Sequence, residues 1–183
     1  MFRRSLIATI TALSIGVLMS DAADAQTAEP GNTWNLELKD GCKVAIKLRP
    51  DLAPKMVERV KTLTAEGFYD GTPFHRVIEG FMAQGGDPSG SGSGGSKLPN
   101  VPAEFTNKAH FLRGTVGAAR TNDPNSANSQ FYIMFAPATH LDGQYTIFGQ
   151  VVSGMECIDK IKRGSGGGGT VSGPDKIIHA TIS

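Results

Sequence analysis

Short stretches in which apolar and polar residues alternate dominate the chain from residue 34 to its end, and turn residues separate them. Residues 34–38 and 43–48 flank Lys39-Asp40-Gly41, which predicts a β-hairpin with a glycine-containing turn. Two short strands are expected within residues 74–87. Further strands are expected at residues 115–119, 131–135, 148–152 and 176–182. The pattern therefore predicts a mainly β protein.

Two segments repeat apolar residues at helical spacing instead. Pro54 begins the first of them and Gly67 ends it, while the apolar residues between them recur every three or four positions. This apolar stripe is interpreted as core packing. The second helix is expected at residues 155–161. Many short strands with only two helices favour a closed antiparallel β-barrel over a parallel sheet.

The first 25 residues have the order of a secretory signal peptide. Arg3 and Arg4 precede an apolar run, and Ala23-Asp24-Ala25 provides small residues for cleavage after Ala25. The alternative is a retained membrane anchor, but the apolar run is shorter than the roughly 20 residues that span a bilayer. We therefore expect a signal peptide at 1–25, a short extension at 26–33 and one domain at 34–183. The mature protein would be periplasmic or secreted, with no membrane attachment.

The net charge narrows the possible binding partners. The formal net charge of +1 indicates neither nucleic acid nor an anionic membrane surface as a partner.

Cys42 and Cys157 are the only cysteines. In an oxidising compartment they could pair, or they could remain two small buried thiols, because the sequence does not place their Cα atoms within bridging distance. The four histidines lack zinc-type spacing, so no metal is expected.

The segment Phe74–Asp87 concentrates the candidate chemistry. It places Arg76 near large apolar side chains, the Gln84 amide and a Gly-Gly bend. An arginine does not shuttle protons near neutral pH, so it is expected to donate fixed hydrogen bonds and stabilise charge. The Gly/Ser-rich residues 87–96 lack the Gly-Lys-Ser/Thr of a phosphate-binding loop and are interpreted as a surface connection. Residues 164–169 are interpreted as a flexible connection.

Three blocks in order, at residues 74–87, 114–133 and 141–151, resemble the signatures of the cyclophilins, a family of peptidyl-prolyl cis-trans isomerases. The resemblance implies a closed eight-stranded antiparallel barrel whose two ends are covered by helices. It also implies a substrate site on an outer face, no cofactor, proline-containing polypeptides as partners and a monomer. The expected role is to assist the folding of exported proteins.

Motif positions then imply individual site residues. Arg76 matches the catalytic position of the family, where its guanidinium would stabilise the twisted amide. The implied substrate-binding residues are His75, Phe81, Met82, Gln84, Ala119, Arg120, Gln130, Tyr132, His140, Leu141 and Tyr145. Phe81, Met82, Leu141 and Tyr132 would form the proline pocket, Gln84 and Gln130 would organise the substrate carbonyl and the arginine, and Ala119 and Arg120 would receive the residues before proline.

The period of two along a strand gives some of these residues a direction. It places Gln130 and Tyr132 on one face, with Phe131 pointing into the barrel. It separates His75 from Arg76, so His75 is interpreted as a positioning or packing residue. It also places Met82 and Gln84 on one face and Phe81 on the other, unless the bend at Gly80 changes this.

Three positions depart from the commonest family pattern. His140 stands where many members have tryptophan or phenylalanine, Tyr132 where phenylalanine is usual, and Tyr145 where histidine is frequent. Losing a large aromatic ring beside the pocket removes apolar contact area, which predicts weak binding of cyclosporin.

The sequence leaves two alternatives to the isomerase. One is a non-catalytic proline-peptide-binding chaperone module on the same scaffold. The other is a secreted hydrolase centred on His75, for which the chain lacks a Gly-x-Ser-x-Gly nucleophile elbow.

Overall fold

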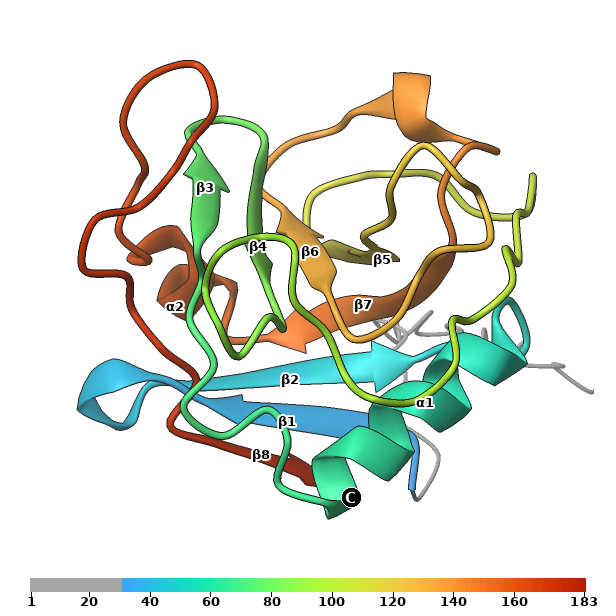
Figure 1. Ribbon diagram of the computed structural model, residues 1–183, viewed down its shortest axis with the longest axis horizontal. Helices are drawn as coiled ribbons and strands as arrows, with labels where there is room; N and C mark the ends of the chain where they lie inside the picture. The colour runs from blue at the N-terminus through green and yellow to red at the C-terminus, as the bar shows by residue number, and fades with distance from the viewer. Residues whose placement is uncertain (1–30) are drawn as a thin grey trace, which may run out of the picture.

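The structure is a computed structural model that describes residues 31–183 (Figure 1). The predicted signal peptide and most of the 26–33 extension lie outside these residues, so cleavage after Ala25 stays a prediction. Within residues 31–183, no helix is long and apolar enough to cross a membrane.

Eight antiparallel strands form one curled sheet with the order β3-β4-β6-β5-β7-β2-β1-β8. In Figure 1, β1, β2 and β8 lie together along the lower edge, and β3, β4, β5 and β6 lie above them. The strands are β1 (Thr33–Glu37), β2 (Lys43–Leu48), β3 (Arg76–Ile78), β4 (Met82–Gly85), β5 (Thr115–Ala118), β6 (Phe131–Met134), β7 (Ile147–Ser153) and β8 (His179–Ile182). The mainly β prediction is confirmed, with strand ends shifted by no more than three residues.

The expected closed barrel is not found, because β3 and β8 are the two ends of the sheet and no ladder joins them within the described residues. Irregular chain fills the gap instead: Phe74 N–H donates to the Asp175 carbonyl at 2.9 Å, and Pro73 forms a single bridge with Lys176. Proline has no N–H to donate to a ladder. The final strand accordingly begins at His179 rather than at residue 176, and the sheet is an open half-barrel.

The predicted hairpin is present as β1 and β2, whose alternating side chains reach the core. Asp40 adopts φ 61° in the connecting 3-10 turn, a left-handed conformation that aspartate tolerates better than most residues. Trp34 is fully buried and packs edge-on against Tyr69 and Phe131, with ring centroids 5.0 Å and 4.9 Å away. The hairpin therefore supplies one wall of the main core and Phe131 supplies the opposite wall.

Two helices pack against this sheet, as predicted. Helix α1 (Pro54–Ala65) contacts β7 and β8, and α2 (Met155–Asp159) contacts β2. The residue before α1 provides no side-chain cap, but the Glu104 carboxylate accepts hydrogen bonds from Lys55 N–H and Met56 N–H, both at 3.0 Å. A carboxylate at this position satisfies free amides and interacts favourably with the helix dipole.

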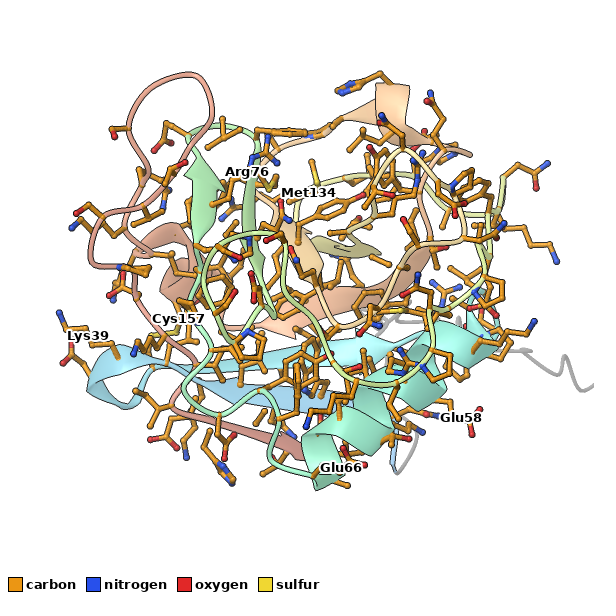
Figure 2. The ribbon with its side chains drawn as sticks, viewed as in Figure 1. Lys39, Glu58, Glu66, Arg76, Met134 and Cys157 are labelled. Carbon is orange, nitrogen blue, oxygen red and sulfur yellow. A yellow bond between two sulfur atoms is a disulfide. The ribbon has the colours of Figure 1, made fainter. Side chains whose placement is uncertain are left out.

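A disulfide joins Cys42, which precedes β2, to Cys157 in α2. The two Cα atoms lie 5.8 Å apart although the residues are separated by 115 positions. Figure 2 shows Cys157 at the same end of the molecule as Lys39 of the hairpin turn. Of the two alternatives that the sequence left open, the structure contains the bond, which ties the hairpin to the C-terminal part of the chain.

Candidate functional site

A cavity of about 190 Å³ opens between β3, β4 and β6 and the segments that follow β5 and Ala138. Neighbouring strands place Arg76 opposite Gln84, and Gln84 opposite Tyr132, so these three residues form a row across the sheet. The cavity is lined by Arg76, Phe81, Met82, Gln84, Ala119, Arg120, Tyr132, Leu141 and Tyr145. All nine were predicted as site residues, and the fold brings them together.

Tyr132 and Phe131 lie on opposite faces of β6, as strand alternation predicted. Phe131 belongs to the main core, whereas Tyr132 belongs to a second apolar cluster with Met82 and Phe111. Its ring stacks on Phe111 and stands edge-on to Tyr145, with centroids 5.8 Å and 6.0 Å away. The site therefore lies on the outer face of the sheet and not in its interior.

A glycine gives Tyr132 its room. Gly117 lies opposite Tyr132 on β5, and a Cβ atom at Gly117 would approach Tyr132 Cζ to 2.6 Å. Burial raises the pKa of Tyr132, so its hydroxyl is neutral at physiological pH. Gly117 was not predicted as a site residue, since no local sequence pattern shows which side chain a glycine faces.

Strand alternation alone would point Phe81 away from Met82 and Gln84, but the bend at Gly80 changes its direction. Phe81 precedes β4 and follows Gly80, whose φ of +68° turns the chain, so the strict alternation begins only at Met82. Phe81 consequently joins them in the cavity wall. His140 is not among the lining residues. It stacks on Phe81 from outside, with ring centroids 6.2 Å apart.

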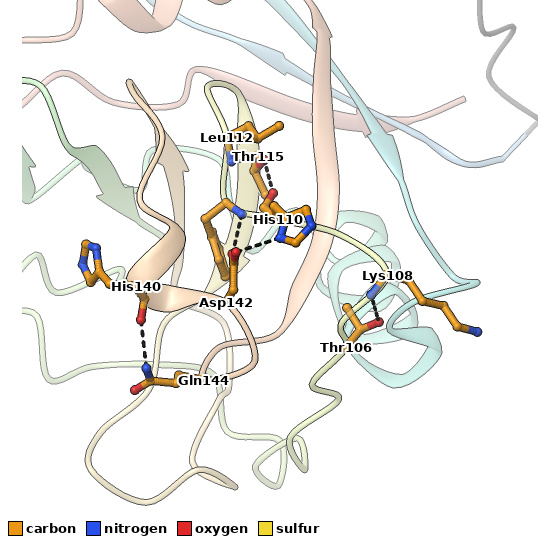
Figure 3. Close-up of polar contacts among 9 residues, drawn as sticks. Thr106, Lys108, His110, Leu112, Thr115, His140, Asp142 and Gln144 are labelled. Atoms are coloured by element: carbon orange, nitrogen blue, oxygen red, sulfur yellow. Dashed lines mark hydrogen bonds and ion pairs between the residues drawn. The ribbon is translucent and has the colours of Figure 1, made fainter.

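The turn that carries Leu141 is held by Asp142 (Figure 3). Its carboxylate accepts a hydrogen bond from Phe111 N–H at 2.8 Å and contacts His110 Nδ1 at 2.7 Å. Desolvation raises the pKa of Asp142, but these hydrogen bonds outweigh it, so the pKa is lowered and the carboxylate stays ionised. Gln144 Nε2 also donates to the His140 carbonyl at 2.8 Å. These contacts position Leu141 against the cavity.

The Arg76 guanidinium is held from two sides. Its Nε donates to the Gly168 carbonyl at 3.0 Å, and its Nη1 donates to Gln84 Oε1 at 3.1 Å. Within residues 31–183, Nη2 makes no hydrogen bond, so this group can donate to a ligand. Nothing in the local sequence identified Gly168 as a partner of Arg76.

The segment 164–169 was interpreted as a flexible connection, but backbone hydrogen bonds attach both of its ends to β3. Gly164 N–H donates to the Val77 carbonyl at 2.9 Å, and Val77 N–H donates to the Gly169 carbonyl at 2.8 Å. These bonds place the Gly168 carbonyl beside Arg76.

Gln130 lines a second cavity of about 470 Å³, which shares Gln84, Ala119 and Arg120 with the first. Its Oε1 accepts from Gln84 Nε2 at 2.9 Å, and its Nε2 donates to the carbonyls of Gly92 and Gly94. Arg120 lines both cavities; its guanidinium lies 4.3 Å from the centroid of the Tyr145 ring. The two cavities thus form one groove, with an apolar end and a polar end.

The segment 87–96 is more than the surface connection expected from its composition. It wraps around the fully buried Asp87 carboxylate. Burial raises the pKa of Asp87, but hydrogen bonds from Ser89, Gly94 and Gly92 outweigh it and lower the pKa to about 2. The sequence analysis missed Asp87. An aspartate two residues before a serine in a glycine-rich segment is typical of side-chain-capped turns and could have indicated it.

His75 lies outside both cavities. It is buried, and within the described residues its ring nitrogens have no hydrogen-bond partner. Burial lowers its pKa, which favours the neutral ring. The assignment of His75 to substrate binding therefore conflicts with its position, and the packing interpretation agrees with it. A hydrolase centred on His75 has no structural support, because a buried imidazole does not reach a bound peptide.

Residues 31–183 contain no group of three or more His, Cys, Asp or Glu side chains arranged to hold a metal ion.

Comparison with known proteins agrees with this geometry. The family model described as cyclophilin type peptidyl-prolyl cis-trans isomerase matches residues 33–182. A probable peptidyl-prolyl cis-trans isomerase of Brucella suis biovar 1 is 53% identical over 99% of this chain and 96% of its own length.

The fold of this chain is also similar to solved cyclophilin structures. A cyclophilin of Hirschia baltica has 26% identity and a TM-score of 0.75 over 85% of this chain and 75% of its own. A cyclophilin type isomerase of Cryptosporidium parvum, crystallised in the presence of the dipeptide Ala-Pro, has 27% identity and a TM-score of 0.74 over 82% of this chain and 98% of its own.

Proposed function

The chain belongs to the cyclophilin-type peptidyl-prolyl cis-trans isomerases and is an enzyme of that class, and from this premise we propose that Arg76 is its catalytic residue and the 190 Å³ cavity its proline site. One observation carries the proposal: a guanidinium with two anchored donor groups borders a small cavity with aromatic and aliphatic walls.

The chemistry needs no covalent intermediate. Rotation about a peptide bond crosses a barrier of about 18–20 kcal/mol, because amide resonance is lost in the twisted state. In that state the proline nitrogen regains a lone pair and can accept a hydrogen bond. Arg76 would donate this bond through Nη2 and so stabilise the twisted state more than either planar isomer. Because Gln84 and the Gly168 carbonyl already orient the guanidinium, little reorganisation is needed during the reaction.

The groove suggests how the substrate lies. The proline ring would fill the apolar cavity, whose walls include Phe81, Met82 and Leu141. The residues before proline would run along Ala119 and Arg120 toward the second cavity, which both residues also line. Gln84 and Gln130 would hold the substrate carbonyl. The Cryptosporidium parvum relative was crystallised in the presence of the dipeptide Ala-Pro, which supports a proline-containing ligand for this groove.

Leu141→Ala tests the assignment of the cavity. Removing this apolar side chain is expected to weaken peptide binding by about 1–2 kcal/mol, which raises KM roughly 5–30-fold while kcat changes less. Exchange spectroscopy on a short Ala-Pro peptide gives both parameters. Leu112→Ala is the matched control, since Leu112 is exposed and does not line the cavity. Equal KM values for the two variants would contradict the assignment.

We also infer that the enzyme is exported and acts on exported polypeptides. The predicted signal peptide at residues 1–25 supports export, and the Cys42–Cys157 disulfide is typical of an oxidising compartment. Amino-terminal sequencing of the protein from a periplasmic or secreted fraction is expected to begin at Gln26. A chain that keeps its amino terminus in the cytoplasmic fraction would contradict this inference.

We further propose that cyclosporin binds weakly and that the enzyme acts as a monomer. His140 stacks on Phe81 with a smaller ring than tryptophan, so less apolar area borders the cavity. Inhibition of exchange is expected only at micromolar cyclosporin, and nanomolar inhibition would contradict this. The mass expected from light scattering is that of one chain, and a dimeric mass would contradict the proposal.

A further inference from the structure

We propose that Asp87 is a positioning residue of the isomerase. Asp87 holds together the loop at residues 87–96, and this loop fixes the direction in which the side-chain amides of Gln130 and Gln84 face. The amide of Gln84 in turn orients Arg76. The inference rests on the proposed role of Arg76 but concerns a buried carboxylate that lines neither cavity.

The Asp87 carboxylate is the centre of the loop. Its Oδ1 accepts hydrogen bonds from Ser89 N–H at 2.8 Å and Ser89 Oγ at 2.7 Å. Its Oδ2 accepts from Gly92 N–H at 2.7 Å, Gly94 N–H at 3.1 Å and Ser91 Oγ at 3.2 Å. These are uncharged donors, and Asp87 itself is fully buried. A buried anion that gathers five hydrogen bonds from one short segment determines the path of that segment.

The two glycines whose amides bind Asp87 also face Gln130. Gln130 Nε2 donates to the Gly92 carbonyl at 3.0 Å and to the Gly94 carbonyl at 2.8 Å. Neither glycine is readily replaced. Gly92 has a φ of +84°, and a Cβ atom at Gly94 would approach Asp87 Oδ1 to 2.1 Å. The carboxylate therefore places two carbonyl acceptors side by side in front of one amide group.

These acceptors decide the orientation of both glutamine amides. An amide has a donor nitrogen and an acceptor oxygen, and each can meet only the complementary group. With Gln130 Nε2 bound to two carbonyls, Gln130 Oε1 faces Gln84 and accepts from its Nε2 at 2.9 Å. Gln84 Oε1 is thereby left to accept from Arg76 Nη1 at 3.1 Å.

Loss of the loop geometry would remove this constraint. If Gln130 reversed, its NH₂ group would face the NH₂ group of Gln84. Gln84 would then reverse as well and present a donor to the guanidinium, which has donors only. Arg76 would lose the hydrogen bond to Gln84, which is one of its two anchors. The apolar cavity and the positive charge of Arg76 would be unchanged. Asp87 therefore acts through hydrogen-bond polarity and not through contact with the substrate.

The test is a double-mutant cycle with Asp87→Asn and Gln130→Ala on the mature chain, measured by exchange spectroscopy on an Ala-Pro peptide. Asp87→Asn keeps the size of the side chain but replaces one acceptor oxygen by a donor. We expect kcat to fall about tenfold with KM changed less than about twofold. In the Gln130→Ala background, Asp87→Asn is expected to have no further effect on kcat. Effects that multiply in the double variant would overturn the proposal.

Structural damage is distinguished by a spectroscopic readout and by milder variants. The Gln130 side-chain amide resonances are expected to shift in Asp87→Asn, because its two carbonyl acceptors move; unchanged resonances would overturn the proposal. Ser89→Ala keeps the carboxylate and removes one donor, so a smaller loss of kcat, about twofold, is expected even if Asp87→Asn does not fold. Asp123→Asn, in a neighbouring loop outside both cavities, is the matched control and should leave kcat unchanged.

A parallel measurement on Arg76→Ala separates the two proposals. Full activity of Arg76→Ala would contradict the catalytic role of Arg76 itself. Loss of activity in Arg76→Ala with full kcat in both Asp87→Asn and Ser89→Ala would overturn only the role of Asp87.

Discussion

Arg76→Ala is expected to lower kcat/KM for an Ala-Pro peptide by about 10²–10³-fold, the usual result of removing one donor aimed at a transition state. The physical reason is that the twisted amide loses the charged hydrogen-bond donor that Arg76 provides, while the apolar cavity that binds the proline ring stays intact. Most of the loss should therefore appear in kcat and little in KM. Exchange spectroscopy measures the rate, and peptide titration measures binding.

Arg76→Lys refines the same prediction. One ammonium group cannot replace the planar arrangement in which Nε binds the Gly168 carbonyl and Nη1 binds Gln84, leaving Nη2 for the substrate. The activity of Arg76→Lys should lie between that of the native enzyme and that of Arg76→Ala. Arg49→Ala is the control, because Arg49 forms a surface pair with Asp51 and does not line the site. Turnover by Arg76→Ala equal to that of Arg49→Ala would refute the mechanism.

Removing the Cys42–Cys157 disulfide is expected to cost about 3–5 kcal/mol of unfolding free energy. The bond closes a loop across 115 positions, and the entropy that it removes from the unfolded chain grows with loop length. For a domain of this size the melting temperature should fall by roughly 10 °C. Denaturant unfolding of the Cys42→Ser/Cys157→Ser variant against the native chain measures the change.

Reduction provides an independent control. A reductant should lower the stability of the native chain by the same amount and leave the double variant unchanged. The bond joins the β1–β2 hairpin to α2, and neither cysteine lines either cavity of the groove, so kcat/KM below the melting temperature should not change. Equal stability of the native chain with and without reductant would contradict the prediction.

The sequence predicted most of the elements whose information is local. The 34–38 and 43–48 hairpin, the helix beginning at Pro54 and the direction of Phe131 and Tyr132 follow from residue periodicity and turn chemistry, because the backbone sets which way successive side chains point. Three motif blocks likewise indicated the nine residues that line the 190 Å³ cavity. Local rules failed where a turn redirected the chain, as at Phe81 after Gly80.

The tertiary structure decided contacts between residues far apart in sequence. Cys42 meets Cys157, Glu104 caps α1, and the Gly168 carbonyl anchors Arg76, although each pair is separated by 48 positions or more. Periodicity carries no information about such pairs, since it describes faces of an element and not what covers them. The same holds for the gap between β3 and β8, where Pro73 and its neighbours replace a ladder, and for Asp87, whose buried carboxylate is stabilised by hydrogen bonds from the folded loop around it.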